Sequence, residues 1–417
     1  MRFDAVIIGG GPAGLSAALT VAEFGWKPVI LEKTRRIGGN CVDSPGFFNA
    51  SDPRRQVKRG ISDTPEKHAL QSLEASRGKA NEAVLKAFCY AAPEALRWLE
   101  ELGVRFGEEV REVPGGAFPR THVPEGGGRA IVEALASGLA RHRVPILLGT
   151  KAERILLRDG RVAGVEAAAG KKRIRIDSRF GVLVASGGFT RNPRLMRTFG
   201  QELEGVQKIG AEGDEGDMLL AAQDIGASVV GLSFFDIVLK TALPLRIARN
   251  PSKIVLLNRE GKRFVREDLR EGGITEAIFG QPGRRAWAVC HGEKGKEGKA
   301  PFTDPVLEAS VRRYDDLCKS GKDTDFGKAP AFLRPIGRPY RIEEVAPVVR
   351  ASLGGLEIAP EGEVLDRTSR KPIPGLAAAG DVSGGTHGER ALTGDLLAAA
   401  VSFGRIGART LVNRGKL

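Results

Sequence analysis

The chain has 417 residues, 41% of them hydrophobic and 28% charged, so it can bury a sizeable core, and its length favours two domains over one. Its formal net charge of +13 would permit binding to an acidic partner, but the basic residues are spread along the whole chain, so we expect no nucleic-acid partner. The four cysteines stand far apart, which gives no support to a disulfide framework, a metal site or attached c-type haem.

The chain begins with a short apolar run that lacks the pattern of a signal peptide. No apolar stretch approaches the ~20 residues that a membrane-spanning helix needs. We therefore expect no membrane span and a cytoplasmic location.

A nucleotide-binding fingerprint follows that first apolar run. Residues 3–8 are suited to a buried parallel strand, and a glycine-rich turn comes directly after them. Gly9, Gly11 and Gly14 fill the three fixed positions of G-x-G-x-x-G. In this motif the first glycine permits the tight turn, the second lets a pyrophosphate approach the backbone, and the third lets the following helix pack close to the sheet.

Two further segments indicate which dinucleotide is bound. A second strand, residues 28–32, ends on Glu32, whose carboxylate can accept hydrogen bonds from ribose hydroxyls of either NAD or FAD. The extension EKTRRIGGN continues past this strand to Asn40, and the distant PIPGLAAAGDVSGG reads as a strand ending at Gly380-Asp381. Both resemble segments of FAD-binding flavoproteins that contact the pyrophosphate and the ribityl chain, so we expect FAD.

Further motifs along almost the whole chain resemble the flavoprotein family of fumarate reductase and succinate dehydrogenase. The closest resemblance is to its soluble members, the fumarate-reducing flavocytochromes and the tricarballylate-dehydrogenase-like proteins. The motifs that carry it are RTHVPEGGG (120–128), VLVASGGFTRNP (182–193), EGDEGDMLLAAQDIGA (212–227), IVLLNREGKRFVRED (254–268), SGKDTDFGK (320–328), SLGGLEI (352–358) and PGLAAAGDVSGGTHGERALTGDLLAAAVSFGRIGA (374–408).

The resemblance implies a Rossmann-like α/β FAD-binding domain of the glutathione-reductase type, interrupted by a smaller α+β capping domain. The FAD-binding domain would comprise residues 1–233 and 339–417, and the cap residues 234–338. A helix would begin near Leu396 at the pyrimidine edge of the flavin, where its N–H groups stabilise negative charge on the reduced ring. The residues expected to bind FAD are Gly9, Gly11, Pro12, Ala13, Gly14, Glu32, Lys33, Gly38, Gly39, Asn40, Ala152, Gly187, Gly188, Asp217, Gly380, Asp381, Gly394, Leu396 and Leu397.

Two absences bear on how the cofactor would work. The stretch GNCVDSPGFFNA corresponds to the segment in which family members attach flavin to a histidine, and it contains no histidine. We therefore expect non-covalent FAD. The haem domain of the flavocytochromes has no counterpart either, so a separate partner would donate or accept electrons.

Family chemistry is hydride transfer between flavin N5 and a carbon–carbon bond of an organic acid, with an arginine exchanging a proton with the substrate. Residues 254–268 predict a hairpin that turns at Glu260-Gly261 and leads to that arginine. Counting from RFV places the family position on Glu271, one residue after Arg270. Arg270 is our first candidate for proton transfer.

The substrate contacts of the family are less well matched than its cofactor contacts. Ala351 stands where the family has its first substrate-binding histidine, and the second histidine has no counterpart. The clamping arginine is displaced by one residue, with Ala391 at its position and Arg390 before it. Arg350 and Arg390 are our candidates for holding an anionic substrate, and His387 is a further candidate for the chemistry. This pattern favours a substrate that is larger or less acidic than fumarate.

Two other functions stay open on the sequence. The chain could be a flavin-dependent oxidase or amine-type dehydrogenase, in which hydride leaves a C–N or C–O carbon. It could also be a flavin-binding protein that has lost family catalysis, because the substrate histidines are replaced. A substrate-dependent release of peroxide would distinguish the first of these, and flavin photoreduction without turnover the second.

Overall fold

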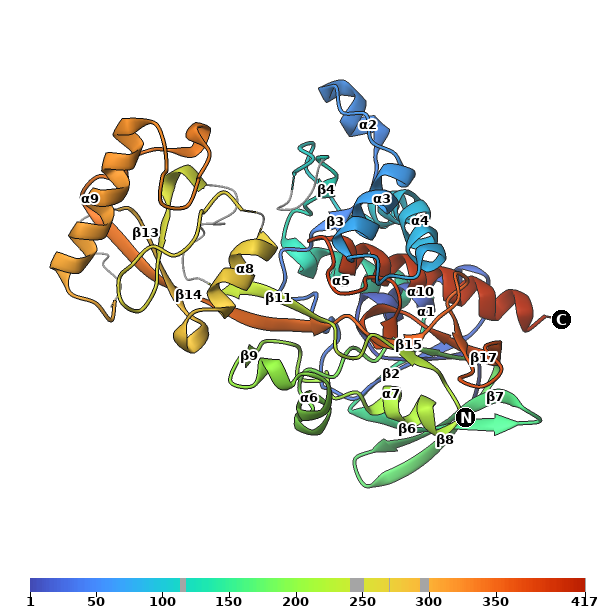
Figure 1. Ribbon diagram of the computed structural model, residues 1–417. Coiled ribbons are helices and arrows are strands. Elements are labelled where there is room, and N and C mark those ends of the chain that lie inside the picture. Colours follow the sequence, from blue (N-terminus) through green and yellow to red (C-terminus); the bar gives the residue numbers. More distant parts are fainter. Residues whose placement is uncertain (113–117, 241–250, 270, 293–299, 417) are drawn as a thin grey trace. The chain divides into compact units, whose positions relative to one another are not determined.

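The computed structural model describes residues 1–112, 118–240, 251–269, 271–292 and 300–416. The chain folds into two compact units, the second inserted into the first (Figure 1). The first unit comprises Met1–Glu204, Lys208–Asp236 and Arg350–Leu417, and the second comprises Gly205–Gln207 and Ile237–Val349. The sequence placed the end of the insertion at residue 338. The second unit extends further because the long strand that begins at Tyr340 pairs within it.

The first unit is built on a sheet with the strand order β16-β17-β8-β1-β2-β5, to which β6 and β7 are attached beside β8. β1 lies parallel to both β2 and β8. Its central residues are fully buried, as a strand covered on both faces requires, and this explains its continuous apolar sequence. The strands of this sheet are β1 (Arg2–Ile8), β2 (Pro28–Glu32), β5 (Ile146–Leu148), β6 (Thr150–Arg158), β7 (Arg161–Ala169), β8 (Lys172–Val184), β16 (Glu363–Leu365) and β17 (Pro372–Ala378).

Two helices from opposite ends of the chain pack on each other in this unit (Figure 1). α1 begins with Pro12, whose fixed φ and missing N–H suit the first helical position. α10 approaches it so closely that a Cβ on Gly404 would lie 2.3 Å from the carbonyl oxygen of Ala13. The helices of the first unit are α1 (Pro12–Glu23), α2 (Pro53–Gln56), α3 (Pro65–Ala75), α4 (Glu82–Glu101), α5 (Gly127–Arg141), α6 (Pro193–Phe199), α7 (Asp217–Asp224) and α10 (Asp395–Arg414).

Two small sheets complete the first unit. One pairs β3 with β4, and the other has the order β10-β15-β18. Their strands are β3 (Phe48–Asn49), β4 (Thr121–His122), β10 (Val229–Val230), β15 (Gly355–Glu357) and β18 (Ser383–Gly384).

The second unit is a sheet of order β11-β14-β13-β12, with β9 paired to β14. Alternate residues of β12 and β13 belong to two hydrophobic clusters on opposite faces, one shared with α8 and the other with α9. The sheet is therefore covered on both sides. Its elements are β9 (Gln207–Lys208), β11 (Phe235–Lys240), β12 (Val255–Leu257), α8 (Glu271–Phe279), β13 (Ala286–His291), α9 (Asp304–Ser320) and β14 (Tyr340–Ser352).

The predicted hairpin over residues 254–268 is only half formed. Its first strand is β12, but after the turn a single bridge joins Leu257 to Arg263 and no second strand follows. Side-chain contacts replace the ladder there. Glu267 is fully buried, forms two hydrogen bonds with Arg263 and pairs with Lys328 at 3.0 Å. Because these charges are paired in the interior, they hold the segment without a strand.

Candidate cofactor site

A large pocket in the first unit opens at the carboxyl ends of its parallel strands. Ile8, Glu32 and Ala185 line it where β1, β2 and β8 end, and the first turns of α1 and α10 contribute further residues. Its free space is about 1580 Å³, including the part open to solvent at the mouth. Its lining residues run from the glycine loop at Gly9 to the first turn of α10 at Leu397, an extent that suits an extended dinucleotide.

The three glycines of the fingerprint have three different surroundings. Gly9 has a φ of +112°, and a Cβ there would lie 2.1 Å from the carbonyl oxygen of Ala185. A Cβ on Gly14 would lie 2.0 Å from the carbonyl oxygen of Gly9, whereas a Cβ on Gly11 would meet no atom within 4 Å. Gly9 and Gly14 are therefore required by the fold itself, and Gly11 leaves backbone open to a ligand.

Glu32 and Lys33 are held firmly at the side of the pocket next to this loop. The Glu32 carboxylate accepts hydrogen bonds from the backbone N–H groups of Gly10 and Thr34, both at 2.7 Å. Lys33 Nζ lies 2.5 Å from the carboxylate of Asp217, which also pairs with Lys151 at 2.9 Å. Burial raises the pKa of Asp217, but hydrogen bonds from the two lysines outweigh it and hold that pKa below its ordinary value.

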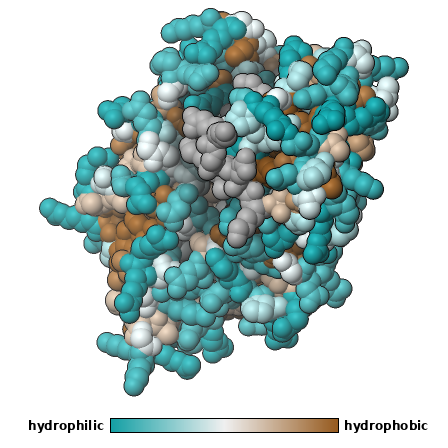
Figure 2. Space-filling view, turned by 90° about the vertical axis from the view of Figure 1, so that its left-hand side faces the viewer, coloured by the Kyte–Doolittle hydropathy of each residue, from teal (hydrophilic) through white to brown (hydrophobic). Residues whose placement is uncertain are grey.

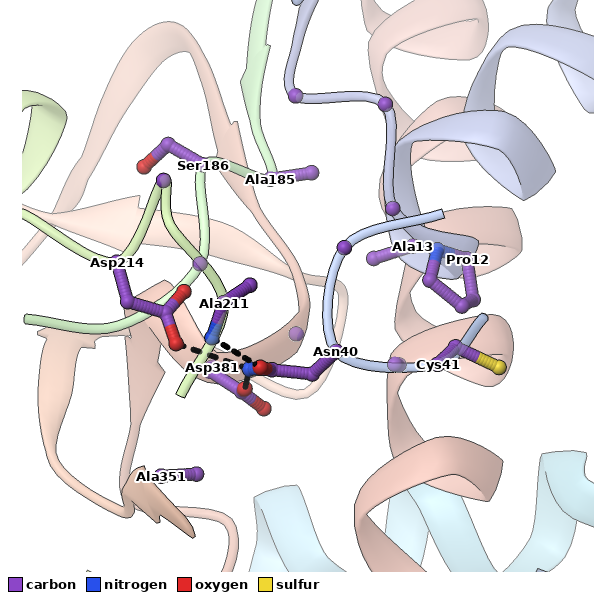
Figure 3. A pocket seen from close by; sticks show the side chains of 18 of the residues that line it. Pro12, Ala13, Asn40, Cys41, Ala185, Ser186, Ala211, Asp214, Ala351 and Asp381 are labelled. Carbon is purple, nitrogen blue, oxygen red and sulfur yellow. Dashed lines mark hydrogen bonds between the residues drawn. The ribbon is translucent and has the colours of Figure 1, made fainter. Parts of the chain in front are cut away.

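Two acidic side chains meet at Asn40 in the middle of the pocket (Figure 3). The Asn40 amide donates to Asp214 at 2.9 Å and to Asp381 at 3.2 Å, while its carbonyl oxygen accepts from the N–H of Ala211. Burial, followed by the negative charge of Asp214, raises the pKa of Asp381 to about 7. Burial also raises the pKa of Asp214, which is only 3% exposed. Asp214 also receives backbone hydrogen bonds from Gly188 and Ala211, whereas Asp381 has only the Asn40 amide as a hydrogen-bond donor among the described residues.

The first turn of α10 forms the other end of the pocket. Thr393, Gly394, Leu396 and Leu397 line it. Gly394 precedes the helix with a φ of +104°, and no side chain caps the helix. A helix N-terminus carries a partial positive charge on its N–H groups, so this end of the pocket favours an anionic group.

Most residues that the sequence assigned to the cofactor come together in this pocket. Three do not line it, namely Gly14, Gly38 and Gly188, and each instead allows close packing. Asp214 lines the pocket as well, although only the second aspartate of the run EGDEGD (212–217), Asp217, was predicted from the sequence. The pocket residues that were expected are Gly9, Gly11, Pro12, Ala13, Glu32, Lys33, Gly39, Asn40, Ala152, Gly187, Asp217, Gly380, Asp381, Gly394, Leu396 and Leu397.

The candidates for catalysis are less clearly assembled. Arg350 lines the pocket beside Ala351, and its guanidinium donates to the carboxylate of Asp236. His387 lines a small cavity that shares Asp381 with the pocket, and burial lowers its pKa, which favours the neutral ring. Arg390 lines neither cavity. Arg270 lies outside the described residues.

Comparisons with known proteins agree with the reading of this pocket. A family model described as an FAD binding domain matches residues 4–397. The fumarate reductase (cytochrome) of Shewanella frigidimarina is 28% identical over 97% of this chain and 76% of its own length. The urocanate reductase of Eggerthella lenta is 30% identical over 97% of this chain and 73% of its own length. The NADH:fumarate oxidoreductase of Klebsiella pneumoniae is 27% identical over 99% of this chain, but the chain spans only 48% of that relative.

A solved structure gives the same picture of the fold. The open conformation of a flavocytochrome c3 fumarate reductase superposes with a TM-score of 0.86 at 25% identity, covering 99% of this chain and 78% of the other. Fold and pocket together define a flavoprotein whose cofactor is FAD. Within this class, the chain belongs to the fumarate reductase/succinate dehydrogenase flavoprotein family of FAD-dependent oxidoreductases.

The residues of the pocket fit this cofactor. The open backbone at Gly11 suits the pyrophosphate, the Glu32 carboxylate suits a ribose, and the acceptor groups at Asp214 and Asp381 suit the hydroxyls of the ribityl chain.

None of the helices in the described part of the chain has both the length and the apolar character of a membrane span. Hydrophilic side chains predominate on the face of the molecule shown in Figure 2, with apolar areas between them.

Proposed function

We propose that the chain interconverts a saturated and an α,β-unsaturated carbon–carbon bond of an organic acid or a related compound. The observation that carries the proposal is the pocket, which combines an open glycine loop at one end with an uncapped helix N-terminus at the other. Family membership supports the reaction type, since relatives are named fumarate, acrylate and urocanate reductases. FAD supplies the hydride acceptor or donor when it is bound.

We assign the chain's own residues three tasks in this reaction. The backbone around Gly11 and the Glu32 carboxylate orient the cofactor at its adenosine end. Arg350 binds the acidic group of the substrate, and His387 supports the site as a neutral ring. Arg390, which lines neither cavity, is assigned to the same acidic group on the sequence alone. Arg270 exchanges the proton with the substrate carbon, a role that rests on the sequence alone because the residue lies outside those described.

We propose a substrate with one carboxylate or another weakly acidic group, rather than a small dicarboxylate. Ala351 offers no hydrogen bond at the position of a family histidine, and part of the Arg350 charge is already matched by Asp236. A second carboxylate would therefore find fewer matched donors in the pocket, which costs free energy when it is desolvated. The substituted positions thus support a substrate less acidic than fumarate.

FAD is proposed to be held without a covalent bond. The described residues that line the pocket include no histidine and no tyrosine. Cys41 lines it, but burial raises the pKa of its thiol to about 12, so the thiol stays protonated and is a poor nucleophile.

We further propose a separate electron donor or acceptor and a cytoplasmic location. Four free cysteines are compatible with a reducing compartment.

The proposal is tested by anaerobic reoxidation of the reduced protein. The flavin is reduced with dithionite, excess reductant is removed, and fumarate, acrylate, urocanate and larger unsaturated acids are added one at a time. We expect fast recovery of the oxidised flavin spectrum with at least one acid that carries a single carboxylate. Peroxide formation with a saturated amine or alcohol would favour an oxidase instead. Reduction without reoxidation by any acid would favour a protein that has lost family catalysis.

The role of Arg270 has a matched control in the same segment. Arg270→Ala should abolish reoxidation by the acid and leave the amount of bound FAD unchanged. Arg266→Ala removes a neighbouring arginine that donates to the carboxylate of Asp268, and it should leave reoxidation near the wild-type rate. Equal rates for wild type and Arg270→Ala would remove Arg270 from the mechanism.

A further inference from the structure

A buried carboxylate lies directly behind the end of the pocket formed by α10. Asp395 is the first residue of that helix, and its side chain is inaccessible to solvent. One carboxylate oxygen accepts from Asn49 Nδ2 at 2.7 Å and lies 2.9 Å from His68 Nε2. The other oxygen accepts from Ser72 Oγ at 2.7 Å. Donors on β3 and α3 therefore hold the side chain, while its chain neighbours Gly394 and Leu396 line the pocket.

The surroundings keep this carboxylate ionised. Burial raises the pKa of Asp395, but the adjacent His68 and the hydrogen bonds from Ser72 and Asn49 outweigh it and bring that pKa below its ordinary value. The second nitrogen of His68, Nδ1, is buried and has no hydrogen-bond partner among the described residues. The ionised Asp395 carboxylate is the one negative charge among the four side chains of this cluster, Asn49, His68, Ser72 and Asp395.

The position of the cluster relative to the cofactor follows from the pocket. Glu32 and the glycine loop mark the adenosine and pyrophosphate end. An extended FAD therefore directs its flavin ring toward the other end, where Gly394, Leu396 and Leu397 flank Asp395 in the chain. Two-electron reduction with uptake of one proton leaves the ring with a negative charge. A helix N-terminus carries about half a positive charge, and a full negative charge at its first residue acts against it.

We infer that Asp395 tunes the cofactor: its buried negative charge lowers the reduction potential of FAD bound in the pocket and makes the reduced flavin a stronger hydride donor. Asp395 does not touch the reacting atoms and acts only through its charge. The inference requires bound FAD but is independent of the substrate and of the direction of the reaction. It concerns a cluster built from α3, β3 and α10, three elements far apart in the sequence.

The test compares midpoint potentials of the flavin in the full-length protein. Asp395→Asn keeps the size of the side chain, and its amide can still accept from Asn49 and His68 and donate to Ser72, so only the charge is lost. We expect its midpoint potential to be more positive by at least ~30 mV. For a two-electron couple this shift corresponds to a tenfold change in the equilibrium constant of reduction. Ser72→Ala is the matched control, because it removes one hydrogen bond and keeps the charge. Its potential should equal that of the wild type.

The outcomes separate tuning from a structural role. A wild-type potential in Asp395→Asn would overturn the inference, even if the variant were less stable. Should that variant fail to retain FAD, Asp395→Ser removes the same charge with a smaller side chain. His68→Gln provides an independent check, since it keeps a donor to the carboxylate and leaves the charge in place. Its potential should match or lie below that of the wild type, and a positive shift would contradict the account.

Discussion

Groups that face the open pocket and groups packed immediately behind it differ in one consistent way. Gly11 faces space, and Asp381 and Asp214 share the amide of one asparagine. Behind them, Gly14 is in backbone contact, and Asp395 has three donors for its two oxygens. In this inner layer the Asp395 carboxylate is therefore fully hydrogen-bonded without a ligand, whereas Asp381 in the outer layer is not.

This contrast separates the interactions that stabilise the fold from those that are available to bind the cofactor. The pKa of Asp381 is raised, mainly by burial and by Asp214, because too few donors compensate its charge. The pKa of Asp395 is lowered because its donors overcome the same cost of burial. Hydroxyl groups of a bound FAD would supply the missing donors at Asp381. Substitutions in the inner layer should consequently affect stability, and those in the outer layer cofactor binding.

The largest contrast is expected between two glycines of one loop. Gly14→Val places side-chain atoms where a Cβ alone would lie 2.0 Å from a backbone oxygen, so we expect little folded protein. A Cβ at Gly11 meets no atom within 4 Å, so Gly11→Val should fold, but its side chain fills the space for the pyrophosphate and should prevent FAD binding. Circular dichroism and flavin absorbance measure the two properties. A Gly11→Val protein that retains a full complement of FAD would break the comparison.

A buried carboxylate that is fully paired should be costly to truncate. Asp395→Ala leaves donors on Asn49, His68 and Ser72 without their acceptor, and we expect a loss of about 3 kcal/mol in the free energy of unfolding. Urea denaturation measures it. Asp395→Asn should lose much less, because the amide still occupies the same contacts. Equal losses for the two variants would mean that hydrogen bonding does not hold this cluster together.

Asp381 should make the stability of the FAD-free protein depend on pH. Its pKa is about 7 in the folded chain and roughly 3.9 in an unfolded one. Between these values the folded state binds more protons, so the free energy of unfolding falls as pH rises from about 4 to about 7. Below about pH 4 the Asp381 carboxyl is protonated in both states and does not lower the free energy of unfolding. Above about pH 7 it is ionised in both states, and the loss of stability has reached its full value.

The measurement uses Gly11→Val as the FAD-free background. Urea midpoints are compared from pH 5 to pH 7.5 with and without a second change, Asp381→Asn. That change should flatten the decline with pH, whereas Asp43→Asn, at an exposed carboxylate, should leave it as it was. An unchanged slope in the Asp381→Asn protein would show that Asp381 does not titrate in this range.

The smallest effect is expected at the solvent edge of the pocket. The side chain of Lys151 is 44% exposed and shares Asp217 with Lys33. Exposed ion pairs contribute about 1 kcal/mol or less, so Lys151→Ala should change the melting temperature slightly and retain FAD. Differential scanning calorimetry of the two proteins measures the difference. A loss comparable to that of Asp395→Ala would mean that the edge belongs to the inner layer.

Features that depend on neighbouring residues could be predicted from the sequence, whereas features that join distant segments could not. The glycine loop and Glu32 lie within one strand–helix–strand unit, so their spacing sufficed to place them. The pairing of Asn40 with Asp214 and Asp381 joins segments far apart in the chain, and no local pattern shows which aspartate of EGDEGD turns inward. The prediction of a full hairpin over residues 254–268 was wrong for a related reason. The ionic contact of Glu267 with distant Lys328 overrides local strand propensity.

Non-covalent binding of FAD in the pocket of the first unit underlies every proposal made above. The most direct measurement is to precipitate the purified protein with acid and quantify the flavin in the supernatant by chromatography. We predict close to one FAD per chain in the supernatant and none in the pellet, and no FAD from Gly11→Val. A folded wild-type protein that contains no flavin and cannot be reconstituted with FAD would contradict the claim.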